Sequence, residues 1–114
     1  MVVLRDKISD ERFERYMTAM KKQRADNWDG WEAANQADIS LNALYIGILE
    51  KDGDLLNKVK EGLGSEMFSY STGNGWHEDG SYVDHDVFAY TGGYGSVLIT
   101  AMEKMMPLVA GTEF

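Results

Sequence analysis

The chain has 114 residues, of which 44% are hydrophobic and 26% charged, and its formal net charge is −8 at pH 7. This length suits one domain with a modest core, and no apolar run approaches the ~20 residues of a membrane-spanning helix. The lack of cysteine excludes disulfides and thiolate metal sites, and an acidic chain without a basic stripe argues against nucleic acid as a partner. The N-terminus has no apolar segment typical of a secretory signal, and no membrane partner is expected.

The first predicted helix covers residues 9–24. Ser9 is its expected N-cap, with acidic residues directly behind it and basic residues at the other end. Apolar residues recur at helical spacing, which predicts one buried face. This face consists of Phe13, Tyr16, Met17 and Met20.

Two further helices are expected to form an antiparallel hairpin. The second helix begins between Asn35 and Asp38. Because apolar residues cover more than half of its circumference, we expect it to be buried on several sides. The segment KDGD at 51–54 ends it, and Asp54 is the predicted cap of the third helix. The apolar face of the third helix consists of Leu56, Val59, Leu63 and Met67.

A last helix is predicted from about Ser96, with Pro107 marking its end or a kink. Its apolar residues are Val97, Leu98, Met102 and Met105. Residues 69–95, before it, are rich in glycine and tyrosine, contain both histidines and show no sustained period, which predicts an irregular segment with a functional role. The predicted fold is therefore all-α, with about four helices and one long loop in a single domain over residues 1–114.

The loop holds the residues best suited to chemistry. His85 and Tyr94 lie nine positions apart, and glycines at 92, 93 and 95 permit unusual backbone angles or a close ligand around Tyr94. Two alternatives stay open, because Tyr94 also suits a core-filling role and nearby side chains are competent ligands for divalent ions. These side chains are His77, Asp79, Asp84, His85 and Asp86. Their spacing matches no EF-hand loop, so the metal site is the lesser alternative and no metal is assigned to these residues.

Two stretches resemble one enzyme family. The segment DGSYVDHDVFAYTGGYGSVLI (79–99) is similar to the signature of polysaccharide lyase family 8, which contains hyaluronate, chondroitin AC and xanthan lyases. Upstream, AANQADISLNALYIGIL (33–49) resembles the family segment that opens a helix of its toroid. The two motifs place Asn35 fifty positions before His85, which is the separation the resemblance requires.

The resemblance implies a partial α/α toroid, the catalytic domain that large β-sandwich domains follow in the family. The family's catalytic set is an asparagine, a histidine, a tyrosine and an arginine. By motif position the first three correspond to Asn35, His85 and Tyr94, whereas the arginine belongs to a helix beyond residue 114. The family also holds sugar rings on aromatic side chains. The expected substrate-binding residues are Trp28, Trp31 and Tyr90. No cofactor is expected.

The implied reaction is β-elimination on a uronate-containing polymer, in which the C5 proton is removed and the C4 oxygen is expelled. The uronate carboxylate must be hydrogen-bonded as enolate charge develops, a role that the Asn35 amide and His85 suit. Tyr94 would take the proton as phenolate and return one to the leaving oxygen. A phenol with an ordinary pKa of about 10 is a poor base at neutral pH unless a cation lies near it.

The expected partner is an acidic polysaccharide. The chain is expected to be a fragment, a truncated product or a small relative of a longer lyase, and to be inactive alone. Either the remainder of a lyase or a second copy would cover its apolar surface. The family's extracellular or periplasmic location is implied only by the resemblance. The alternative hypothesis is a non-catalytic carbohydrate-binding or self-associating helical module that keeps the lyase shape.

Overall fold

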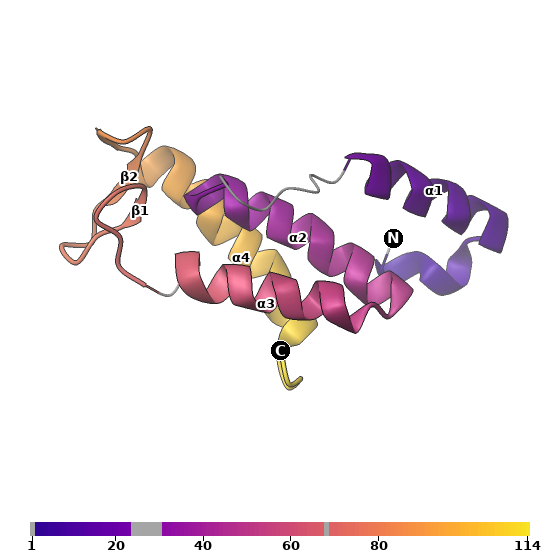
Figure 1. Ribbon diagram of the computed structural model, residues 1–114. Coiled ribbons are helices and arrows are strands. Elements are labelled where there is room, and N and C mark those ends of the chain that lie inside the picture. The colour runs from indigo at the N-terminus through magenta and orange to yellow at the C-terminus, as the bar shows by residue number, and fades with distance from the viewer. Residues whose placement is uncertain (1, 24–30, 68) are drawn as a thin grey trace.

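Helices account for most of the structure, a computed structural model that describes residues 2–23, 31–67 and 69–114. The molecule is elongated, with extents of 48 × 29 × 24 Å. A small sheet lies at one end, the helices of residues 2–7 and 10–23 lie at the other, and the remaining α-helices lie between them (Figure 1). The prediction of an all-α fold with four helices is confirmed. The helical elements are a 3₁₀ helix η1 (Val2–Lys7), α1 (Asp10–Gln23), α2 (Ala33–Glu50), α3 (Gly53–Met67), a π-helical turn η2 (Thr91–Gly95) and α4 (Ser96–Val109).

The predicted long loop contains a three-stranded antiparallel sheet of strands β1 (Gly75–Trp76), β2 (Tyr82–Asp84) and β3 (Phe88–Ala89). Trp76 pairs with Tyr82, and Asp84 pairs with Phe88, so β2 is the central strand. The sequence did not predict these strands. Two or three residues are too few to show the alternation that identifies a strand.

Helix α2 is the centre of the fold, because α3 and α4 both pack against it. This confirms the burial expected from its broad apolar surface. Small residues let the neighbouring helices approach closely: Ala37 and Ala43 are 0% exposed, and a Cβ atom built on Gly47 would lie 2.7 Å from Leu56 Cδ2 of α3. The helix begins at Ala33, slightly before the predicted start.

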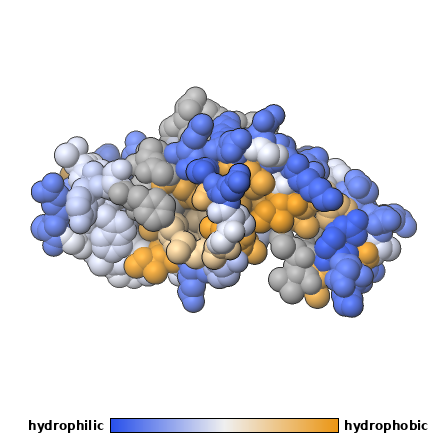
Figure 2. Space-filling view, turned by 90° about the horizontal axis from the view of Figure 1, so that it is seen from below, coloured by the Kyte–Doolittle hydropathy of each residue, from blue (hydrophilic) through white to orange (hydrophobic). Residues whose placement is uncertain are grey.

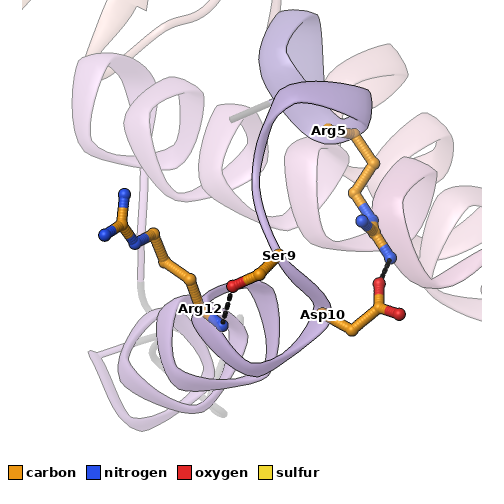
Figure 3. Close-up of polar contacts among 4 residues, drawn as sticks. All are labelled: Arg5, Ser9, Asp10 and Arg12. Atoms are coloured by element: carbon orange, nitrogen blue, oxygen red, sulfur yellow. Dashed lines mark hydrogen bonds and ion pairs between the residues drawn. The ribbon is translucent and has the colours of Figure 1, made fainter.

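The start of α1 follows the prediction. Ser9 caps the helix, since its Oγ accepts a hydrogen bond from the Arg12 N–H at 3.4 Å, and Arg5 pairs with Asp10 at 2.9 Å (Figure 3). Lys21 pairs with Glu50 and ties α1 to the end of α2. The predicted apolar face is only partly buried: Phe13 and Met17 are buried and Met20 packs against the core, but Tyr16 is 45% exposed.

The turn between α2 and α3 corrects one prediction. Lys51 ends α2 in the left-handed conformation with φ 58°. The cap of α3 is Asp52 rather than Asp54, because Asp52 Oδ1 accepts the Leu55 N–H at 3.0 Å. The difference follows from the helix beginning at Gly53, which already places Asp54 inside the first turn. Leu55, Val59 and Leu63 are buried, whereas Leu56 is half-buried.

Helix α4 continues past Pro107 for only two residues, as expected for a residue that cannot donate to the preceding turn. Leu98 and Met105 are buried against the core, whereas Val97 is 39% exposed. On the face seen from below, hydrophobic residues lie along the middle and hydrophilic residues flank them (Figure 2). Among the described residues, no helix combines the length and hydropathy that spanning a bilayer would require.

Candidate functional site

The first turn of α2 positions Asn35. Glu32 precedes the helix in an extended conformation, and Ala33 enters it with φ 52°. Ala34 and Ala37 are buried against the core, which leaves Asn35 exposed on the opposite side. Asn35 therefore lies on the exposed side of the helix, while Ala34 and Ala37 anchor the backbone.

A tight turn between β2 and β3 positions His85. Both His85 and Asp86 have positive φ, at 50° and 67°, a conformation that costs free energy for residues with a side chain. Side chains hold this turn: Asp84 Oδ1 accepts the His85 N–H at 2.9 Å, and Asn74 Oδ1 accepts the Asp86 N–H at 2.9 Å. Asn74 also donates to Glu32 Oε2 at 3.0 Å and thereby links the turn to the start of α2.

Tyr94 comes from the turn η2, directly before α4. Its ring meets the His85 ring edge-on with centroids 5.1 Å apart, and Tyr90 contacts the same tyrosine at 5.3 Å. Tyr90 also lies 6.1 Å from the His85 ring and is 41% exposed. The three rings form one cluster. Gly93 makes this packing feasible, since a Cβ atom there would lie 2.7 Å from Tyr90 Cδ1.

A cleft of about 260 Å³ brings two of the three predicted catalytic residues together. It lies between the start of α2 and the β2–β3 turn, and Trp31 forms part of its wall with a side chain that is 42% exposed. Tyr94 borders this cleft through its contact with the His85 ring and is not itself a lining residue. The lining consists of Trp31, Glu32, Ala33, Asn35, Asn74, Asp84, His85 and Asp86. Trp28, also predicted to bind substrate, lies outside the described residues.

The described lining of the cleft is acidic, with three carboxylates (Glu32, Asp84 and Asp86) and no lysine or arginine. A partial positive charge opposes them, because the cleft lies at the N-terminus of α2, where the first N–H groups have no partner within the helix. A carboxylate ligand would therefore depend on N–H and amide donors rather than on a formal cation.

The side chains considered as metal ligands are divided between two places. Asp84, His85 and Asp86 line the cleft, whereas His77 and Asp79 lie in the β1–β2 turn. The Nε2 atom of His77 lies 2.7 Å from the Gly73 carbonyl oxygen. Hydrogen bonds from the Ser81 side chain and backbone lower the pKa of Asp79. Over the described ranges, no group of three or more acids and histidines is arranged to hold a metal ion.

Sequence reasoning missed the residues that support the site. Asn74 and Glu32 were not singled out, and nothing in their sequence spacing connects them. Tyr82 and Asp84 are two positions apart in a strand, so they share one face of the sheet, and both are buried. Asp84 was considered only as a metal ligand and Tyr82 was not singled out, because three residues are too few to show the alternation of a strand.

The whole chain, residues 1–114, matches the model of the polysaccharide lyase family 8, N-terminal alpha-helical domain. The chain therefore belongs to this lyase family, as its two sequence motifs indicated.

Individual relatives are lyases of acidic polysaccharides by name. The chain is 35% identical over 115 residues to the xanthan lyase of Bacillus sp. (strain GL1), covering 99% of this chain and 12% of that protein. It is 31% identical over 130 residues to the hyaluronate lyase of Staphylococcus aureus (strain NCTC 8325 / PS 47), covering 100% of this chain and 16% of that protein.

A solved structure shares the fold. The chondroitin AC lyase of Streptomyces coelicolor A3, determined in complex with chondroitin sulphate, superposes with a TM-score of 0.83 at 28% identity. The alignment covers 96% of this chain and 16% of that lyase. The chain thus spans less than a fifth of the length of each of these relatives.

Proposed function

We propose that this chain contributes the asparagine, histidine and tyrosine of a β-elimination site that cleaves an acidic, uronate-containing polysaccharide. Residues 1–114 would form part of one α/α-toroid domain. The observation that carries the proposal is the shared cleft: Asn35 and His85 line it together, and the Tyr94 ring packs 5.1 Å from the His85 ring. Family membership and the names of the relatives support the substrate class.

The three side chains suit the three demands of the reaction. Abstraction of the C5 proton builds negative charge on the uronate carboxylate, and preorganised donors stabilise such charge most effectively where water is excluded. The Asn35 amide is a neutral donor, and His85 is a second donor from the opposite wall of the cleft. Tyr94 then moves the proton, first from C5 and afterwards to the departing C4 oxygen.

The surroundings of the cleft set how a polymer would bind. Trp31 offers an exposed indole face to the apolar C–H face of a sugar ring. The start of α2 adds the partial positive charge of a helix N-terminus, which favours the carboxylate. The described lining has no formal cation, and the resemblance implies an arginine from a helix beyond residue 114.

The test is whether the chain forms an unsaturated product. Hyaluronan, chondroitin and xanthan fragments are incubated with the chain, and the ultraviolet absorbance of the new C4–C5 double bond is followed. In the active chain, Tyr94→Phe should lower turnover by about 10²- to 10⁴-fold, the usual contribution of a general acid–base group. Tyr70→Phe is the matched control, because that tyrosine is 69% exposed and outside the cleft. Undiminished product from Tyr94→Phe would rule out the proposed base.

The exposed Trp31 beside the cleft also supports a second candidate function, a carbohydrate-binding module that does not cleave its ligand. Titration with oligosaccharides, followed by tryptophan fluorescence in the chain and in Trp31→Phe, separates the two. Saturable binding that Trp31→Phe abolishes, without any unsaturated product, would favour the binding module. A chain that binds none of the three polymers would contradict the binding module.

A further inference from the structure

Tyr82 is a buried residue at the junction of the site that the proposed chemistry does not use. Its side chain is 0% exposed and is among the largest fully buried side chains in the protein. It lies on the central strand β2 and makes three contacts, one within this strand and two with segments elsewhere in the sequence. Each of these contacts involves the immediate chain neighbour of a candidate catalytic residue.

The first contact reaches the start of α2. The Tyr82 hydroxyl accepts the Ala34 N–H at 3.0 Å. Ala34 directly precedes Asn35, and this N–H belongs to the first turn of the helix, where no intrahelical acceptor exists. Tyr82 therefore attaches the backbone that carries Asn35 to the sheet, across 48 residues of sequence.

The second contact stays within β2. The same hydroxyl donates to Asp84 Oδ2 at 3.4 Å, while Asp84 Oδ1 accepts the His85 N–H at 2.9 Å. A hydroxyl has one proton to donate, so accepting from Ala34 and donating to Asp84 orients it in a single direction. The hydrogen bonds thus run from Ala34 through Tyr82 and Asp84 to the backbone of His85.

The third contact is between the ring and the turn that carries Tyr94. A Cβ atom on Gly95 would lie 3.2 Å from Cγ and 3.3 Å from Cβ of Tyr82, so the ring sits directly on the backbone of the residue after Tyr94. The backbone of Tyr82 reinforces this side: its carbonyl accepts the Tyr90 N–H at 2.7 Å, and its N–H donates to Thr91 Oγ1 at 3.2 Å.

We propose that Tyr82 is the positioning residue of the site, holding Asn35, His85 and Tyr94 in their relative places through Ala34, Asp84 and Gly95. This inference rests on the proposed function for its catalytic consequence. Tyr82 does not reach the cleft, so it acts only through these neighbours. Displacements on the order of 1 Å in a positioned group lower turnover by about 10²-fold, which is the scale at which such a residue matters.

The first variant is Tyr82→Phe, which keeps the ring and removes the hydroxyl. The side-chain amide of Asn35 and the imidazole signals of His85 are followed by NMR, together with the proton–proton contact between the His85 and Tyr94 rings. We expect the Asn35 and His85 signals to shift and the ring contact to weaken. His77 is an internal reference, since it lies in the other turn, and Tyr70→Phe is the matched loss of a tyrosine hydroxyl from an exposed position.

The second variant changes the backbone position against which the Tyr82 ring packs. Gly95→Ala inserts a methyl group against the ring and moves it without removing its hydroxyl. Gly92→Ala is the control, because the same substitution three residues earlier in η2 meets nothing within 4 Å. Gly95→Ala should reproduce the His85 shifts, and Gly92→Ala should leave them in place. This pair decides the proposal if Tyr82→Phe fails to fold.

The kinetic measurement separates positioning from general destabilisation. In an active chain, Tyr82→Phe and Gly95→Ala should lower kcat by about 10- to 100-fold, with KM within about twofold of the unsubstituted value because Trp31 is untouched. A chain without lyase activity would count against the proposed function, and the NMR signals would then decide the positioning role alone. Unchanged Asn35 and His85 signals in both variants would overturn the proposal, as would a kcat equal to that of the controls.

Discussion

Removing the Tyr82 hydroxyl should destabilise the fold by an amount that the structure allows us to work out. The ring of Tyr82→Phe still fills the same space, so the hydrophobic contribution is nearly unchanged. The loss is polar: the Ala34 N–H loses its acceptor in a buried place, and Asp84 loses one donor. An unsatisfied buried group costs about 1–3 kcal/mol, so we expect the free energy of unfolding to fall by about 2 kcal/mol at neutral pH.

The same hydroxyl should make the stability of the unsubstituted chain depend on alkaline pH. Burial raises the pKa of Tyr82 to about 12, and the negative charge of Asp84 adds to this effect. In the unfolded chain a tyrosine ionises near its ordinary pKa of about 10. Between these values only the unfolded chain releases the proton. The stabilisation is therefore complete below about pH 10 and is lost as the pH rises towards about 12, by up to about 1.4 kcal/mol per pH unit.

Urea unfolding from about pH 8 to about pH 11 tests both numbers. The quantity of interest is the difference in unfolding free energy between the unsubstituted chain and Tyr82→Phe. It should be constant at about 2 kcal/mol up to about pH 10 and shrink above it, because only the unsubstituted chain carries this titration. Tyr70→Phe should keep the alkaline decline. Two parallel curves over the whole range would refute the assignment of Tyr82 as a buried, neutral hydroxyl.

Two further predictions concern the helical hairpin, and both are read from urea unfolding. Gly47→Ala gains about 1 kcal/mol of helix propensity but places a methyl group 2.7 Å from Leu56 Cδ2, an overpacking cost of about 1–3 kcal/mol, so the chain should be destabilised. In a Leu56→Ala background the same substitution should become stabilising, and an unchanged sign would show that the contact is not the cause. Asp52→Ala should cost about 1 kcal/mol by removing the cap of α3, against about 0.3 kcal/mol for Asp54→Ala, which removes only a charge from the first turn. Equal losses would contradict the observed cap.

The helices were predictable because their signals are local and repeated. Four periodic segments gave four helices, and Ser9 marked the start of α1. The wrong predictions are those of single positions, such as a cap or the edge of an apolar face, where no repeated pattern supports the choice. Asp52 and Asp54 are equally good caps by type, and only the position at which the chain leaves the left-handed Lys51 decides between them. Tyr16 follows the apolar spacing, yet it lies at the edge of the face that α1 buries.

The candidate site also depends on contacts that no local sequence pattern predicts. Asn35, His85 and Tyr94 were singled out by motif order and spacing, and the structure brings Asn35 and His85 to one cleft. That these residues carry catalysis stays a prediction. The supporting residues were not foreseen, because a hydrogen bond such as that between Tyr82 and Ala34 joins positions 48 apart and depends on how the sheet docks onto α2. No periodicity within a segment encodes that docking.

The hydrogen bond at Ala34 also makes one amide a reporter of local unfolding. Backbone amides in the first turn of a helix exchange quickly with solvent, because no carbonyl within the helix protects them. At Ala34, the Tyr82 hydroxyl supplies the partner from outside. Its exchange rate therefore measures how often the sheet separates from α2 while the helices themselves stay folded. The opening of the candidate site has its own free energy, distinct from that of global unfolding. Hydrogen exchange at the Ala34 amide measures this free energy.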